Sequence, residues 1–142
     1  MIFEHITIEG ASGFQADVAT ALLRLRRTAS WSLMAGVTAI KQCDWGDDNA
    51  AGYATGTWIC LLHGAMGHDS GWLVGVLAHE AFHVSRGCAT GDAEERAAFA
   101  AQQTALKQIG AREHVGTVRQ MVRGDHHRRW TASWGFGNVA VE

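Results

Sequence analysis

The chain has 142 residues, of which 47% are hydrophobic, and this is enough for the core of one domain. Its formal net charge of −2 gives no electrostatic reason to expect a nucleic-acid partner. No apolar run reaches the roughly 18 residues that a membrane-spanning helix needs, so no membrane partner is expected. Without a linker, a repeat or a low-complexity tract, residues 1–142 are expected to form a single domain. The first residues lack the features of a signal peptide, which predicts a cytoplasmic location.

The first third of the chain alternates between predicted strands and one helix. Isoleucines on one side of residues 2–8 predict a short strand. Residues 14–28 repeat apolar side chains at spacings of three and four, which predicts a helix with Ser12 as its N-cap. Residues 37–40 are β-branched and alternating, as in a strand. Residues 43–52 are rich in aspartate and glycine, which is typical of a loop.

The rest of the chain is predicted to be mainly helical. Residues 53–62 are read as one strand whose first half, small and weakly apolar, is typical of an edge strand. Ser70 is expected to cap a helix over residues 71–86, and further helices are predicted over 93–109 and 114–122.

The three cysteines give no sign of a disulfide framework. Cys43, Cys60 and Cys88 are odd in number, far apart and without a CxxC pairing. They are therefore expected to be free thiols, and a zinc knuckle is excluded.

The central motif is His79-Glu80-Ala81-Phe82-His83, an HExxH sequence inside the predicted helix 71–86. Side chains four residues apart lie on one face of a helix, so His79 and His83 can direct two imidazoles at one ion. Glu80 lies about 100° away, near the ion without binding it. This pattern predicts Zn²⁺ with an open position for water, and Glu80 as the general base that accepts the proton of that water.

A third ligand is expected, because catalytic zinc normally has three protein ligands. Glu95 shares a face of helix 93–109 with residues that are predicted to pack inward, which makes it the first choice. Glu94 shares a face with alanines and is the second choice. Two alternatives stay open: Glu95 can instead form a capping box with Asp92, and His114 is another possible ligand.

These two segments carry a resemblance to a known family. The HExxH motif followed by Glu95-Arg96-Ala97-Ala98-Phe99-Ala100-Ala101-Gln102 resembles the zincin metallopeptidases, in particular the compact gluzincin-like branch of bacteria and phages. The resemblance implies an α+β fold: a minimal zincin-like core with a small antiparallel or mixed sheet packed on the HExxH helix, and two or more further helices. It also implies one Zn²⁺ ion held by His79, His83 and a glutamate.

The implied reaction is hydrolysis of a peptide bond by a zinc-bound water that Glu80 activates, on a peptide or protein substrate. The substrate would lie along the edge strand around residues 53–59, with Tyr53, Thr57 and Trp58 as substrate-binding residues. The alternative is a zincin-like domain that binds metal and a peptide or protein partner without significant catalysis. A metal-free structural helical domain is a third hypothesis.

No motif identifies the residue that would stabilise the oxyanion. His126 and His127 follow a predicted turn, and His63 stands in the loop before the HExxH helix, so these three are put forward. By chemistry alone the further candidates are Tyr53, His68 and His114. The glycine- and tryptophan-rich tail over residues 130–142 is assigned no role.

Overall fold

The computed structural model of the protein describes residues 1–44 and 51–123. Its helices and strands follow one another as β1 (Ile2–Phe3), β2 (Ile6–Glu9), α1 (Ser12–Arg26), η1 (Ala29–Gly36), β3 (Ala39–Gln42), β4 (Gly52–Thr55), β5 (Trp58–Leu61), η2 (His63–Ala65), α2 (Ser70–Ser85), α3 (Asp92–Gln108) and α4 (Arg112–Val122). The prefix η marks short 3₁₀ helices. Most of the predicted loop 43–52 and the whole tail 130–142 fall outside the described residues.

The strands form one mixed sheet in the order β1-β2-β3-β5-β4. The central pairs β2–β3 and β3–β5 are parallel, whereas the outer pairs β1–β2 and β4–β5 are antiparallel hairpins. The register aligns Ile8 with Ile40 and Ile40 with Ile59, and all three side chains are buried. Since side chains alternate along a strand, one face of the sheet carries this apolar row against the helices. The predicted α+β class with a small mixed sheet is confirmed.

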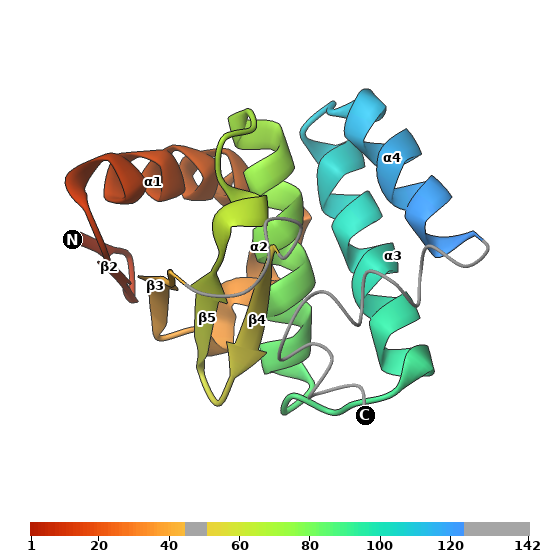
Figure 1. The fold of residues 1–142 in the computed structure, drawn as a ribbon, viewed down its shortest axis with the longest axis horizontal. Helices are drawn as coiled ribbons and strands as arrows, with labels where there is room; N and C mark the ends of the chain where they lie inside the picture. The colour runs from red at the N-terminus through yellow and green to blue at the C-terminus, as the bar shows by residue number, and fades with distance from the viewer. Residues whose placement is uncertain (45–50, 124–142) are drawn as a thin grey trace.

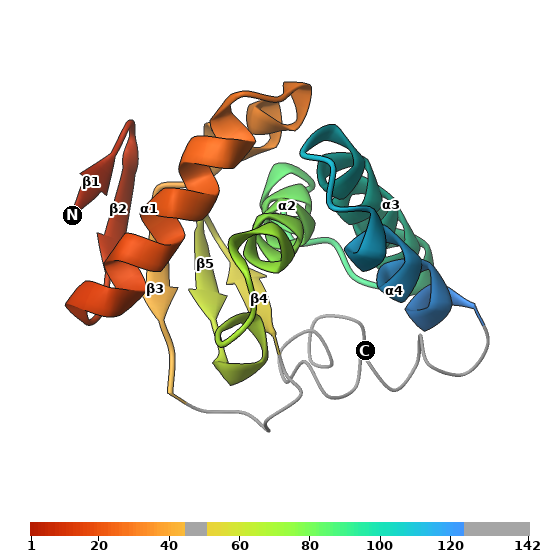
Figure 2. The same cartoon turned by 90° about the horizontal axis from the view of Figure 1, so that it is seen from above.

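Helix α2 occupies the middle of the molecule. It lies between the sheet and the α3–α4 pair, while α1 crosses the sheet beside it (Figure 1, Figure 2). A helix covered on two sides must be apolar around most of its circumference, and nearly every residue from Gly71 to Ala81 is buried. Gly75 allows α3 to approach closely, because a Cβ there would lie 3.1 Å from the side chain of Leu106. Among the helices of the described residues, none is both long and apolar enough to cross a membrane.

The four predicted helices are present, but two strand predictions are wrong because a turn was missed. Residues 2–8 form the hairpin β1–β2, with Glu4 in the left-handed region at φ 55°. Residues 53–62 form the hairpin β4–β5, with Gly56 at φ 57° in its turn. Glycine adopts that conformation without steric cost, so Gly56 and Thr57, predicted as part of one strand, are in fact the bend between two.

The predicted caps are also wrong, since each serine is the first residue of its helix. The cap of α2 is Asp69, whose Oδ1 accepts a hydrogen bond from the backbone N–H of Trp72 at 2.9 Å. The cap position of α1 is Ala11, which makes no side-chain cap bond. Aspartate is as good an N-cap as serine, and the sequence offered both residues side by side.

Cys43 and Cys60 form a disulfide, so the expectation of three free thiols is wrong for this pair. The parallel pairing of β3 with β5 aligns Lys41 with Cys60, and the backbone N–H of Cys43 donates to the carbonyl of Leu61. The two Cα atoms are 5.7 Å apart, a separation that a disulfide spans. Strand pairing brings together cysteines that are 17 residues apart, which their spacing in the sequence does not reveal. Cys88 is not in a disulfide.

Candidate metal centre

Both histidines of the HExxH motif project from α2 toward α3. Their ring centroids are 5.1 Å apart, as expected for neighbours four residues apart on one helix face. The Nε2 atom of His79 lies 2.7 Å from Glu95 Oε1, and the Nε2 atom of His83 lies 3.1 Å from Glu95 Oε2. The carboxylate of Glu95 is 2% exposed and the side chain of His83 is 12% exposed. Solvent therefore reaches this cluster past His83.

Glu95, and not Glu94, is the glutamate at the cluster. Glu94 faces outward, where it accepts hydrogen bonds from Nε and Nη2 of Arg86, both at 3.1 Å. The cap position of α3 is Gly91, which has no side-chain cap bond, and the carboxylate of Glu95 faces the imidazoles instead of the helix start. Burial alone raises the pKa of Glu95, but the charges and hydrogen bonds of His79 and His83 outweigh burial and hold this pKa well below its usual range.

The donor set suits a zinc ion. Two imidazole nitrogens and a carboxylate are typical zinc ligands, and tetrahedral ligands about 2.0–2.1 Å from zinc lie roughly 3.3–3.4 Å from one another. The two nitrogen–oxygen distances to Glu95, 2.7 and 3.1 Å, are slightly shorter. By distance alone, a second buried group can hold a metal ion: His79, Glu80 and His83 each offer one ligand atom within 4.8 Å of the others. Glu95 is the better candidate for the third ligand, because its carboxylate contacts Nε2 of both histidines.

Glu80 has the features of a group that acts on a reactant. Its side chain is buried between α2 and the edge strand β4, and no described residue offers a hydrogen bond to its Oε2 atom. A Cβ at Gly52 would lie 3.7 Å from Glu80 Cγ and 2.7 Å from the carbonyl oxygen of Cys60. Burial raises the pKa of Glu80, although His79 and His83 partly oppose this rise. A raised pKa suits a carboxylate that must accept and return a proton near neutral pH.

Gln102 is the functional candidate that sequence reasoning missed. Its Oε1 lies 3.0 Å from Nδ1 of His79, on the side of the ring opposite Glu95. The sequence does carry the signal, because Gln102 falls seven residues after Glu95 on the inward stripe of α3. Its spacing alone, however, predicts only packing against a neighbouring helix. Phe99, on the same stripe, packs edge-on against His79 with ring centroids 4.6 Å apart.

Among the strands that the structure describes, the predicted edge segment contributes one end strand of the sheet, β4. Strand β5 pairs with β3 on one side and β4 on the other, so its main chain cannot accept a peptide.

The three predicted substrate-binding side chains lie elsewhere. Tyr53 alternates with Gly52, which faces Glu80, and therefore lies on the opposite face of the sheet. Trp58 is stacked beneath the ammonium group of Lys41 at 4.1 Å. The hydroxyl and carbonyl of Thr57 are bonded to Thr38. None of these three side chains makes a hydrogen bond to the His–Glu cluster among those the structure describes.

His63 and His114, which the structure describes, are engaged away from the cluster. His126 and His127 lie outside the described residues. His63 forms an ion pair with Asp44 at 3.2 Å, and its side chain is 57% exposed. His114, also weighed as a third ligand, bonds to Asp69 at 2.9 Å beside the start of α2. Asp69, Glu113 and His114 form another group of potential ligands, but this group is mostly exposed and Asp69 is already engaged as a helix cap.

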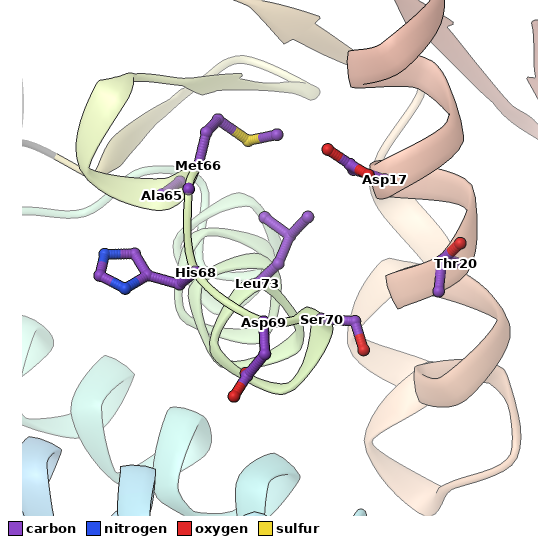
Figure 3. Close-up of a pocket in the computed structure, with 9 residues that line it drawn as sticks. Asp17, Thr20, Ala65, Met66, His68, Asp69, Ser70 and Leu73 are labelled. Carbon is purple, nitrogen blue, oxygen red and sulfur yellow. The ribbon is translucent and has the colours of Figure 1, made fainter.

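A cavity of about 330 Å³ opens near the same end of α2. Figure 3 shows Met66 and Leu73 directed toward the space beside Asp17 of α1, whereas the ring of His68 points the other way. His68 instead lies against Trp72, with ring centroids 5.6 Å apart. Leu73 is the residue of α2 in this lining that stands nearest to His79. Since it precedes His79 by six residues, roughly 9 Å at 1.5 Å per residue, this cavity is separate from the metal cluster.

Comparison with known proteins adds no relative to this picture. The chain matches no protein-family model, no curated protein and no solved structure.

Proposed function

We propose that this protein is a zinc-dependent peptide hydrolase. The observation that carries the proposal is the buried carboxylate of Glu95, bonded to Nε2 of both HExxH histidines. The adjacent Glu80, whose Oε2 atom has no hydrogen-bond partner among the described residues, supports it. Likeness of the HExxH helix and the glutamate-bearing helix to the zincins points to the same reaction.

His79, His83 and Glu95 would hold the ion. Zinc in such a site acidifies a water molecule and polarises a carbonyl group. Glu80 acts as the general base: it accepts a proton from the attacking water and later donates it to the amine that leaves. Its burial serves this role by keeping its pKa above the usual range of a glutamate.

Strand β4 positions the substrate. An extended peptide that pairs with this free edge would gain main-chain hydrogen bonds without any requirement on its own sequence. Gly52 brings the strand against Glu80, so a peptide bond held on β4 lies near the proposed base. Peptides or unfolded protein segments are therefore the proposed substrate class.

A second candidate is metal binding without turnover, and the 1% exposure of Glu80 favours it. A general base must reach water and substrate, whereas a buried carboxylate beside a metal can serve stability alone. In that case the domain would bind metal and a peptide or protein partner, and Glu80 would be a neighbour of the ion without a chemical role.

The Glu80→Gln variant separates the two functions. Zinc content and cleavage of a mixture of unstructured peptides are measured together on the parent and the variant. A hydrolase loses cleavage by about 100-fold or more when its general base is replaced, while its zinc content is unchanged. If the zinc-loaded parent cleaves no better than Glu80→Gln, the proposed hydrolysis is wrong.

The cellular compartment belongs to the proposal as well. The cytoplasm predicted from the sequence is a reducing environment, whereas structural disulfides are typical of oxidising compartments. The Cys43–Cys60 bond therefore favours an oxidising compartment for this protein.

A further inference from the structure

The environment of Gln102 is unusual for a core residue. Its side chain is fully buried on α3, where its neighbours along the inward stripe are the buried Phe99 and Leu106. The Oε1 atom faces Nδ1 of His79 at 3.0 Å, but no described residue accepts a hydrogen bond from its Nε2. A buried amide nitrogen without a partner costs stability, and leucine would fill a similar volume without that cost. Packing alone therefore does not account for glutamine at this position.

The geometry points to a role that acts through His79. A carbonyl oxygen can only accept, so Oε1 requires the proton of His79 to be on Nδ1. In the metal-free site Nε2 donates to Glu95, and a metal ion would take the place of that proton while the proton on Nδ1 stays with Gln102. Histidine ligands commonly donate their second N–H to such a partner, which fixes both the tautomer and the ring orientation.

We infer that Gln102 is a positioning residue, which holds His79 in the tautomer and orientation that bind the metal. The inference rests on the proposed function, since it requires that His79 is a metal ligand. It adds that the neutral amide of Gln102, two turns after Glu95 on α3, sets how strongly His79 on α2 binds the metal. Helix α3 would thus contribute one ligand directly and control a second.

Three variants test this inference through binding of Zn²⁺ to the purified full chain. Gln102→Leu removes the acceptor but keeps the volume, and Gln102→Glu restores an acceptor. Gln103→Leu is the matched control, because it makes the same change one residue further along α3, on a side chain that is only partly buried. Zinc dissociation constants are measured by competition with a coloured chelator, and melting temperatures are measured without metal.

We expect Gln102→Leu to raise the zinc dissociation constant by about 10-fold to 100-fold. Its melting temperature without metal should be unchanged or higher, because the unpartnered amide is gone. Gln102→Glu should bind zinc at least as tightly as the parent, and Gln103→Leu should match the parent. The absorption bands of the Co²⁺-substituted protein should change in Gln102→Leu alone.

Two results would overturn the inference while the proposed function stands. One is parent-like zinc affinity in Gln102→Leu. The other is a parallel loss of zinc affinity and metal-free stability in that variant, which would show that the residue serves packing. Weaker binding by Gln102→Glu than by Gln102→Leu would also contradict the need for an acceptor. If the parent chain itself binds no zinc, the proposed function fails and the inference fails with it.

Discussion

Three glutamates near the HExxH motif are chemically the same but have different surroundings. Glu94 pairs with Arg86 at the surface, Glu95 is buried against two imidazoles, and Glu80 is buried with an oxygen that no described residue bonds. The three environments separate the roles proposed for them: an ion pair at the surface for Glu94, a metal ligand for Glu95 and a general base for Glu80. Proximity in the sequence therefore says little about which carboxylate serves the site.

Asp69 is a residue whose contribution to stability should depend on pH. The backbone N–H of Trp72 and then His114 lower the pKa of this carboxyl group below its usual value. Because the pKa of Asp69 is lower in the folded protein than in the unfolded chain, the ionised carboxylate stabilises the fold at pH values above the unfolded pKa of about 3.9. This stabilisation is lost as the pH falls through the folded pKa.

Replacing this cap should destabilise the protein. Asp69→Ala should lower the free energy of unfolding at pH 7 by about 0.5–2 kcal/mol, which is the range for loss of an N-cap. Asp69→Asn keeps a cap without the charge, so it should stay near the parent at pH 7 and be less sensitive to acid. Urea unfolding at pH 7 and near pH 3 measures both effects. Equal stability of Asp69→Ala and the parent at pH 7 would refute the assigned cap.

At the scale of the elements, β4 packs closely against its neighbour β5, next to the proposed base on α2. Gly52 permits this packing because a Cβ there would lie 2.7 Å from the carbonyl oxygen of Cys60 on β5, whereas Glu80 Cγ on α2 would be at an ordinary contact distance of 3.7 Å. Gly52→Ala should therefore destabilise the protein by about 1–3 kcal/mol, the range typical of overpacking. Gly116→Ala on α4 is the control: its Cβ meets nothing within 4 Å, and it should stabilise by about 0.5–1 kcal/mol. Thermal unfolding of both variants measures these changes in stability. A Gly52→Ala variant as stable as the parent would count against close packing at Gly52.

The elements also show which features were predictable from the sequence. Helices α1 to α4 were predicted because their apolar residues repeat at spacings of three and four over long segments. Hairpins β1–β2 and β4–β5 were read as single strands, since two-residue to four-residue strands carry too little periodicity to reveal the bend. Within the candidate site, the spacing of His79, Glu80 and His83 on one helix predicts their cluster. The position of Glu95 on the inward face of α3 predicts that it joins them. The contact between Gln102 and His79 depends on how two helices pack, which the sequence pattern does not determine.

At the scale of the whole molecule, one covalent bond joins two neighbouring parallel strands. The Cys43–Cys60 disulfide closes a loop between residues 17 apart, and reduction should lower the free energy of unfolding by about 3 kcal/mol. Alkylation of the unfolded protein before and after reduction checks the pairing. Before reduction one thiol, that of Cys88, should react, and all three should react afterwards. Reaction of three thiols in protein that was never reduced would contradict the bond.

The central claim, that α2 and α3 together hold a metal ion, is tested most directly by native mass spectrometry after zinc loading and removal of free metal. The parent should carry one Zn²⁺ ion per chain. Glu95→Gln should lose the ion, because it removes a ligand that contacts both imidazoles. Glu94→Gln should keep the ion, since that carboxylate pairs with Arg86. A parent without bound zinc, or equal zinc in Glu95→Gln and Glu94→Gln, would contradict the claim.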